Sequence, residues 1–212
     1  MHIKEKIEEI ANQIKSCKKC PLHLSKINYV PGEGNPENKI IFIGEAPGSE
    51  EDKQGRPFVG KAGKYLTEQI EKILGIKREE IYITNLIKCR PPKNRDPKEE
   101  EIKNCSEWLI KQIEEIKPNL IVTLGRHSTK FIMEYFGLNF TNIMKERGKI
   151  YVINKWNKDT YIIPTLHPAA VLYHANWKSL FESDFEKIRD IIKKDTKTKK
   201  QTILDYFNMK KN

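Results

Sequence analysis

The chain alternates short apolar runs with longer segments in which apolar residues recur every three or four positions. The short runs are typical of strands buried on both faces of a parallel sheet, and the periodic segments are typical of amphipathic helices. The predicted strands are residues 40–43, 81–84, 120–124, 148–153 and 161–165. The predicted helices are residues 2–16, 61–75, 96–116, 125–136 and 177–192. This alternation predicts an α/β fold of three layers (α/β/α), in which four strands form a central, mainly parallel sheet.

Proline, glycine and lysine mark the limits of these elements. Residues 22–39 contain repeated Pro and Gly and are expected to form a loop. The pair Asp96-Pro97 is expected to begin a helix, with proline at its first position. A chain of 212 residues can bury one sizeable core, so residues 1–192 are expected to form one domain. Residues 193–212 open with the run KKDTKTKK and are expected to form a flexible basic tail.

Polar residues that follow three of the strands indicate a ligand site. The first strand runs into the turn Gly44-Glu45-Ala46-Pro47-Gly48, and Asn85 and His167 follow two later strands. Ligands of open α/β sheets bind beyond the carboxyl ends of the strands, so these side chains are expected to converge. Taken singly, an Asn at a strand end is usually a turn former and a His before Pro is usually structural. Together with Phe58, in the long loop after the first strand, they could hold a nucleobase.

The net charge indicates what would carry such a base. The chain has 39 Lys and Arg against 29 Asp and Glu, which gives a net charge of +10. This balance favours an anionic partner, nucleic acid above all. No apolar run approaches the ~20 residues of a membrane span, and the N-terminal segment is a charged amphipathic helix, not a signal peptide. We therefore expect a cytoplasmic monomer that binds nucleic acid and no membrane.

The four cysteines are spaced as ligands of one metal centre. Cys17 and Cys20 form a Cys-x-x-Cys pair, and Cys89 and Cys105 follow with 15 residues between them. A reducing compartment argues against structural disulfides. Four thiolates can hold zinc or an iron–sulfur cluster, and the wide second spacing favours the cluster. Four buried free thiols and a zinc site remain as alternatives.

Four motifs in this order are similar to those of a known family. They are Gly44-Glu45-Ala46-Pro47-Gly48, Gly55-Arg56-Pro57-Phe58-Val59-Gly60-Lys61-Ala62-Gly63, Thr84-Asn85 with Lys88-Cys89-Arg90-Pro91-Pro92, and His167-Pro168-Ala169. With the four cysteines, this set resembles the family 4 uracil-DNA glycosylases, which are the thermostable iron–sulfur members of the uracil-DNA glycosylase superfamily. The resemblance covers about residues 10–192.

The resemblance implies a cofactor and a base-binding pocket. It implies that Cys17, Cys20, Cys89 and Cys105 hold a structural [4Fe-4S] cluster. The residues implied to line a uracil pocket are Glu45, Ala46, Pro47, Glu51, Phe58, Asn85 and His167. In that pocket Phe58 would stack on the base, Asn85 would read its Watson–Crick edge, and Glu51 would crowd the methyl group of thymine.

The activity implied is hydrolysis of the N-glycosidic bond of uracil in single- or double-stranded DNA, which starts base excision repair of deaminated cytosine. Glu45, Asn85 and His167 would be the catalytic residues, with His167 donating to the uracil anion. Other branches of the superfamily carry a water-activating Asp where this chain has Ala46, so the group that activates water is left unassigned. No amine nucleophile is needed, and we expect a monofunctional enzyme without lyase activity.

Contacts to the DNA outside the pocket are expected from basic and apolar residues. The candidates for phosphate contacts are Arg56, Lys61, Lys88, Arg90 and Arg95, although such residues are often no more than solvated charges. The segment after His167-Pro168 is where the family inserts a wedge into DNA, and here it offers Leu172 or Tyr173.

The basic tail carries a second motif. Ile203, Tyr206 and Phe207 are spaced like the residues that a short helical turn inserts into the pocket of a replication sliding clamp. Lys200 stands where that motif usually has glutamine. The alternative is a terminal turn that docks on the protein's own core.

Two other functions remain open at this point. One is an iron–sulfur module that binds a base in nucleic acid without cleaving it. The other is a zinc-containing, nucleotide-processing protein on a Rossmann-like sheet, against which the absence of a Gly-x-Gly-x-x-Gly turn counts.

Overall fold

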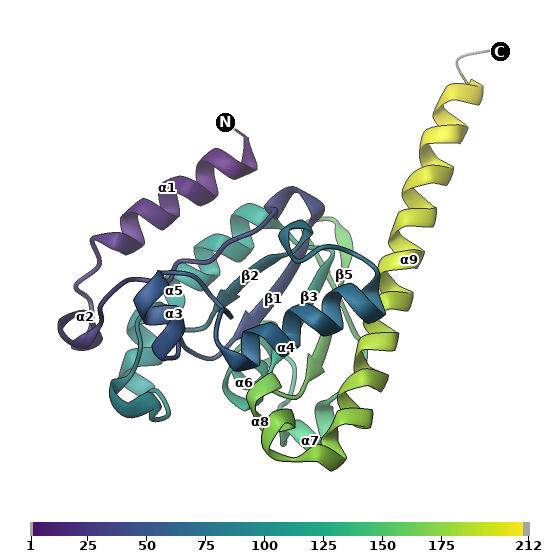
Figure 1. The fold of residues 1–212 in the computed structure, drawn as a ribbon. Coiled ribbons are helices and arrows are strands. Elements are labelled where there is room, and N and C mark those ends of the chain that lie inside the picture. Colours follow the sequence, from purple (N-terminus) through teal and green to yellow (C-terminus); the bar gives the residue numbers. More distant parts are fainter. Residues whose placement is uncertain (1, 210–212) are drawn as a thin grey trace.

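The sheet has five strands in the order β2-β1-β3-β5-β4. The computed structural model describes the backbone of residues 2–209 and the side chains of residues 2–194. The strands are β1 (Ile40–Gly44), β2 (Tyr82–Asn85), β3 (Leu120–Leu124), β4 (Tyr151–Lys155) and β5 (Lys158–Thr165). The first four in this order run parallel, which confirms the mainly parallel sheet (Figure 1).

The expectation of four strands is wrong, because β4 joins the sheet as an antiparallel edge. It pairs with β5 from Tyr151↔Ile162 to Lys155↔Lys158. Trp156 and Asn157 connect the two strands, both with φ near 56°, as a tight two-residue hairpin requires. The hairpin therefore adds a fifth strand beside β5.

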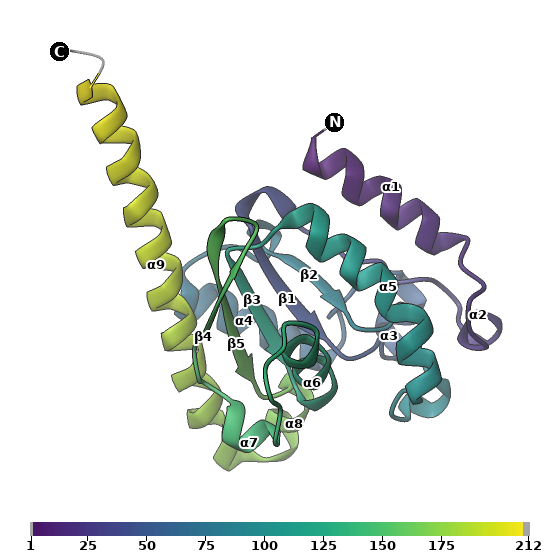
Figure 2. The same ribbon diagram turned by 180° about the vertical axis from the view of Figure 1, so that it is seen from behind.

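Alternate residues of the strands point into two separate apolar layers. Ile41 and Ile43 of β1 pack with helices α1 (Ile3–Lys15), α5 (Glu99–Ile116) and α6 (Arg126–Tyr135). Phe42 packs on the other face, with α4 (Lys61–Gln69) and α9 (Lys178–Met209). The two views in Figures 1 and 2 show the helices on both sides of the sheet. The three-layer architecture is confirmed, because each strand of the centre is buried on both faces.

Several helices differ in extent from the sequence prediction. The 61–75 segment is α4 followed by a π-helical turn, η2 (Ile70–Leu74). Short helices occupy segments expected to be loops: α2 (Leu22–Ser25), η1 (Pro36–Asn38), α3 (Ser49–Gln54) and η4 (Pro92–Asn94). The remaining short helices are η3 (Arg78–Glu80), α7 (Ile143–Glu146), α8 (Pro168–Tyr173) and η5 (Ala175–Trp177).

The helix predicted to start at Asp96-Pro97 starts later. Its N-cap is Lys98, whose extended backbone N–H donates to Oε2 of Glu101 at 2.8 Å. Pro97 lies outside α5 because the side chain of Glu101 fixes the helix start downstream of it.

The last helix continues past residue 192 to Met209, through the segment predicted to be a flexible linker, and projects beyond the sheet (Figure 1). This segment contains several Lys and neither Gly nor Pro, so its composition permits a helix. The side chains of Ile203, Tyr206 and Phe207 lie outside the described residues. Within the part of the chain that the structure describes, no helix is long and apolar enough to cross a membrane.

Candidate active site

A pocket opens at the carboxyl edge of the sheet, where the sequence predicts it. Glu45 directly follows β1, Asn85 ends β2 and His167 follows β5, and all three line this pocket. Its volume is about 290 Å³, near the lower limit for small-molecule sites. Its other lining residues are Ala46, Pro47, Gly48, Glu51, Phe58, Ala62, Pro91, Asn94, Arg95 and Ala169. The predicted convergence is confirmed, and the space suits one small planar ligand.

Asn85 presents an unused polar atom in this pocket. The residue is buried, and among the described residues its Oδ1 has no hydrogen-bond partner. Gly44 lies opposite Asn85 in the β1–β2 register, and a Cβ atom on it would overlap this oxygen. Leaving a buried acceptor unpaired costs about 1–3 kcal/mol, so this amide is expected to take its partner from a ligand.

Phe58 forms a flat apolar wall beside that amide. Its backbone has φ 51°, the left-handed region that an aromatic residue rarely adopts. Its ring centroid lies 5.8 Å from that of His167, with a tilt of 33° between the rings. The ring is buried, and Gly44 leaves room for it, since a Cβ atom there would lie 2.5 Å from its Cζ. The two rings therefore border the same space.

His167 is held as a neutral ring. Burial lowers its pKa, which the negative charges of Glu45 and Glu51 oppose only in part. At the N-cap of α8, its Nδ1 accepts from the backbone N–H of Ala169 at 3.2 Å. Because Nδ1 is the acceptor, the proton of the neutral ring is on Nε2. The ring therefore offers one N–H donor.

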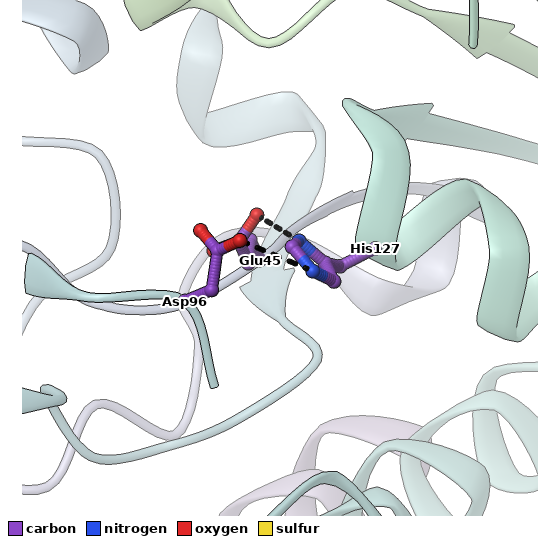
Figure 3. Close-up of side chains that lie close together, drawn as sticks. All are labelled: Glu45, Asp96 and His127. Atoms are coloured by element: carbon purple, nitrogen blue, oxygen red, sulfur yellow. Dashed lines mark hydrogen bonds and ion pairs between the residues drawn. The ribbon is translucent and has the colours of Figure 1, made fainter. Parts of the chain in front are cut away.

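The carboxylate of Glu45 is held by His127, a residue outside the pocket lining that was not predicted from the sequence. Nδ1 of His127 lies 2.6 Å from Oε2 of Glu45, and Nε2 of His127 lies 3.8 Å from Oδ2 of Asp96 (Figure 3). Arg126 donates to the same Asp96 oxygen at 2.8 Å. A signal was available: Gly125-Arg126-His127 directly follows β3, just as the other site residues follow their strands.

Glu51 fixes the loop that carries Phe58. Its Oε1 accepts from the backbone N–H groups of Val59 and Gly60, at 2.8 and 2.7 Å. The carboxylate thereby connects α3 to the start of α4 while it lines the pocket. The expected contact with position 5 of the base stays a prediction.

Comparison with known proteins identifies the family. The model of the uracil DNA glycosylase superfamily matches residues 31–192. The chain belongs to this superfamily. It is 52% identical over 203 residues to the type-4 uracil-DNA glycosylase of Sulfurisphaera tokodaii, covering 96% of this chain and 90% of that protein. It is 49% identical to the type-4 uracil-DNA glycosylase of Archaeoglobus fulgidus, covering 96% of this chain and 100% of that protein. It is 42% identical to the type-4 uracil-DNA glycosylase of Thermotoga maritima, covering 92% of this chain and 100% of that protein. The resemblance to family 4 is confirmed.

The cysteines of this superfamily member converge in a second place, away from the pocket. Cys17, Cys20, Cys89 and Cys105 line one small cavity between α1, α5 and the segment after β2. Trp108 Nε1 donates to the sulfur of Cys17 at 3.3 Å, and the backbone N–H of Lys88 donates to that of Cys105 at 3.2 Å. Four thiols with N–H donors to sulfur fit an iron–sulfur cluster held by four cysteines.

One of the expected phosphate contacts is wrong. Lys88 is buried, and its Nζ donates to Thr84 Oγ1, the carbonyl of Asn85 and Gln112 Oε1, at 2.6 to 2.8 Å. Burial lowers its pKa to about 7. The ammonium group is enclosed by polar atoms of the protein, so it cannot reach a DNA phosphate.

The other residues expected to contact DNA are exposed or half-buried, and their contacts stay predictions. Arg56 pairs with Glu33 at 2.7 Å, Arg95 pairs with Glu101 at 2.6 Å, and Arg90 donates to Asn94 at 2.7 Å. Lys61 begins α4 and is exposed. Leu172 and Tyr173 end α8 with 50% and 86% of their surface exposed, five and six residues after His167.

Proposed function

We propose that this protein is a monofunctional uracil-DNA glycosylase that removes uracil from single- and double-stranded DNA and so starts base excision repair of deaminated cytosine. The observation that carries the proposal is the buried amide of Asn85, whose Oδ1 has no partner within the described chain. It lies beside the ring of Phe58, in a pocket that suits one base. The type-4 names of the relatives support the same activity.

The pocket would select uracil by its hydrogen-bonding edge. The Oδ1 of Asn85 would accept from N3–H of the base, and its NH₂ group would donate to O4. Cytosine presents an acceptor at N3 and an amino group at position 4, so both amide atoms would be mismatched. A site built to pair a buried polar group rejects the analogue that cannot pair with it.

Cleavage of the bond between N1 of uracil and C1′ of deoxyribose would leave the bonding electrons on the base. Nε2–H of His167 would donate to O2 as that negative charge develops, a contribution of about 3 kcal/mol by analogy with oxyanion-hole donors. Glu45 would stabilise the positive charge at C1′ and orient the water that adds there. The water's second proton would pass to a carboxylate or to solvent.

The four cysteines would hold a [4Fe-4S] cluster. When bound, the cluster would supply a structural cross-link and no redox step. Cys17 and Cys20 follow α1, Cys89 follows β2, and Cys105 lies within α5, so binding would join three segments distant in sequence. Pro91, Asn94 and Arg95 follow Cys89 and form part of the pocket wall, which such a cross-link would stabilise.

DNA would bind over the face that holds the pocket, with the base turned out of the stack. Unstacking costs a few kcal/mol in a duplex, so unpaired and mispaired uracil would be the better substrates. Leu172 or Tyr173 would fill the gap left in the stack, and Arg56, Lys61, Arg90 and Arg95 would contact phosphates. Binding of a replication sliding clamp through Ile203, Tyr206 and Phe207 remains a proposal from the sequence motif.

The test is release of uracil from end-labelled DNA that carries one uracil, followed by alkaline cleavage of the abasic site. We expect scission at uracil alone, with matched thymine and cytosine strands intact, in both single-stranded and duplex DNA. Asn85→Asp should lower the rate by more than about 100-fold, because its carboxylate cannot donate to O4. DNA binding without scission by the wild-type protein would contradict the proposal and support the non-catalytic binding module.

A further inference from the structure

The carboxylate of Glu45 is fixed in place by an imidazole that does not line the pocket. A carboxylate only accepts hydrogen bonds, so the 2.6 Å contact requires the proton on Nδ1 of His127. We infer that His127 is a positioning residue for Glu45 in the reaction proposed above, on which this inference rests.

The imidazole is well placed for this role because α6 is firmly anchored. The N–H of Gly125 donates to the carbonyl of Thr165 at 2.9 Å, which joins the start of α6 to β5. Thr129 of α6 contacts Thr123 of β3, hydroxyl to hydroxyl at 2.8 Å. His127 lies between these two attachments, and its side chain is only 18% exposed.

Glu45 is held through both its backbone and its side chain. Its carbonyl accepts from the N–H of Ile87 at 3.1 Å, on the β2 side of the sheet. Its carboxylate contacts α6, on the β3 side. The backbone and the side chain are therefore fixed from different elements, and loss of the imidazole leaves the carboxylate free to rotate.

The outer end of the imidazole faces a charged pair. Asp96 lies 3.8 Å from Nε2 of His127, and Arg126 lies 2.8 Å from Asp96 and 3.2 Å from that nitrogen. Glu45, Asp96 and His127 together could also be ligands of a divalent cation (Figure 3). The guanidinium of Arg126 already provides a cation at Asp96, so the geometry favours a continuous hydrogen-bonded chain, from Glu45 through His127 and Arg126 to Asp96, over a metal site.

Single-turnover uracil release separates positioning from binding. His127→Ala should lower the rate by about 100-fold, the effect of a misplaced catalytic group, with little change in DNA affinity. His127→Asn places an amide N–H near the position of Nδ1 and should recover most of the rate. His127→Gln places the amide N–H near the position of Nε2 and should not recover the rate. Lys130→Ala, an exposed change on the same helix, is the matched control and should leave the rate unchanged.

A double-mutant cycle with Glu45→Ala tests whether His127 acts through Glu45. His127→Ala should have little further effect in that background, whereas independent contributions would multiply. Multiplying effects, or a wild-type rate in His127→Ala, would overturn the inference.

A spectroscopic readout distinguishes this failure from failure of the proposed function. The Nδ1–H proton of His127 should give a downfield NMR resonance that shifts in Glu45→Ala. Absence of that shift would overturn the inference even where uracil is released. If the resonance shifts between the wild type and Glu45→Ala but the wild-type protein releases no uracil, the proposed function is overturned instead. The Glu45–His127 contact is then still established.

Discussion

Arg78 donates through Nη1 to the carbonyl oxygen of Phe58 at 3.0 Å, from a buried position on η3. Its Nη2 donates to the carbonyl of Pro57 and pairs with Glu33 at 2.7 Å. Phe58 needs such support because its backbone is in the left-handed region. The aromatic wall of the pocket is thus fixed by a residue 20 positions away.

Replacing this guanidinium should damage both stability and activity. Arg78→Met leaves the carbonyls of Phe58 and Pro57 without their donor and removes one of the two guanidinium partners of Glu33, and we expect the free energy of unfolding to fall by about 3 kcal/mol. Uracil release should slow as Phe58 loses its fixed position. Arg56→Met is the matched control: Arg56 pairs with the same Glu33 but is 57% exposed, so its loss should cost less than about 1 kcal/mol. Urea unfolding measures the stability of each variant, and single-turnover kinetics measure its rate of uracil release. Equal effects of Arg78→Met and Arg56→Met would contradict the role of Arg78 in holding Phe58.

Gly44→Ala should inactivate the pocket with the fold retained. The added methyl group would overlap the ring of Phe58 and the amide of Asn85, so one of them must move. We expect a loss of uracil release of at least about 100-fold. Gly75→Ala provides the comparison. Its φ of 71° predicts a cost of about 1 kcal/mol, but no atom of the residues that the structure describes lies within 4 Å of the added carbon. That variant should be less stable and fully active, and full activity of Gly44→Ala would refute the proposed base site.

The half-buried, neutral state of His167 should make stability depend on pH. Burial lowers the pKa of this ring below the ordinary value of about 6.5. Between the two pKa values the unfolded chain binds a proton that the folded protein does not, so folding is favoured less there. The stabilisation that the neutral His167 ring gives the folded state is complete above about pH 6.5, and it is lost as the pH falls through the pKa of the folded protein. Melting temperatures of the wild type and His167→Asn, compared from pH 7.5 to 5, should therefore converge or cross toward acid. A constant difference would contradict the assignment.

Loss of one cysteine should disrupt the proposed cluster and weaken the pocket wall. Cys105→Ser is expected to lower the iron content of purified protein from about four atoms per chain, remove its brown colour, and reduce its melting temperature. Activity should fall with them, because Pro91, Asn94 and Arg95 of the pocket wall lie in the segment that follows Cys89. Metal analysis also tests the alternative: zinc, in colourless wild-type protein, would reject the iron–sulfur cluster. Ser106→Ala, one position along the same helix, is the control and should keep the metal.

Much of this architecture follows from local patterns. The apolar runs at β1 and β3 are properties of neighbouring residues, so the sequence predicts these two strands nearly to the residue, and the helical periodicity between them predicts α4 and α5 with shifted ends. The site at the strand ends follows from the same reading, because parallel strands bring their carboxyl ends to one edge. Glu45, Asn85 and His167 could therefore be selected before any coordinates.

Partners distant in the chain required the tertiary structure. Glu45 and His127 are 82 positions apart, and their contact depends on β3 lying directly beside β1. The burial of Lys88 depends on Gln112 of α5 closing over it, although the residue looks like any surface lysine in the sequence. Periodicity determines which face of an element is buried. Strand order and helix packing determine which side chains meet, because those distances are set by the whole sheet and not by the residues on either side.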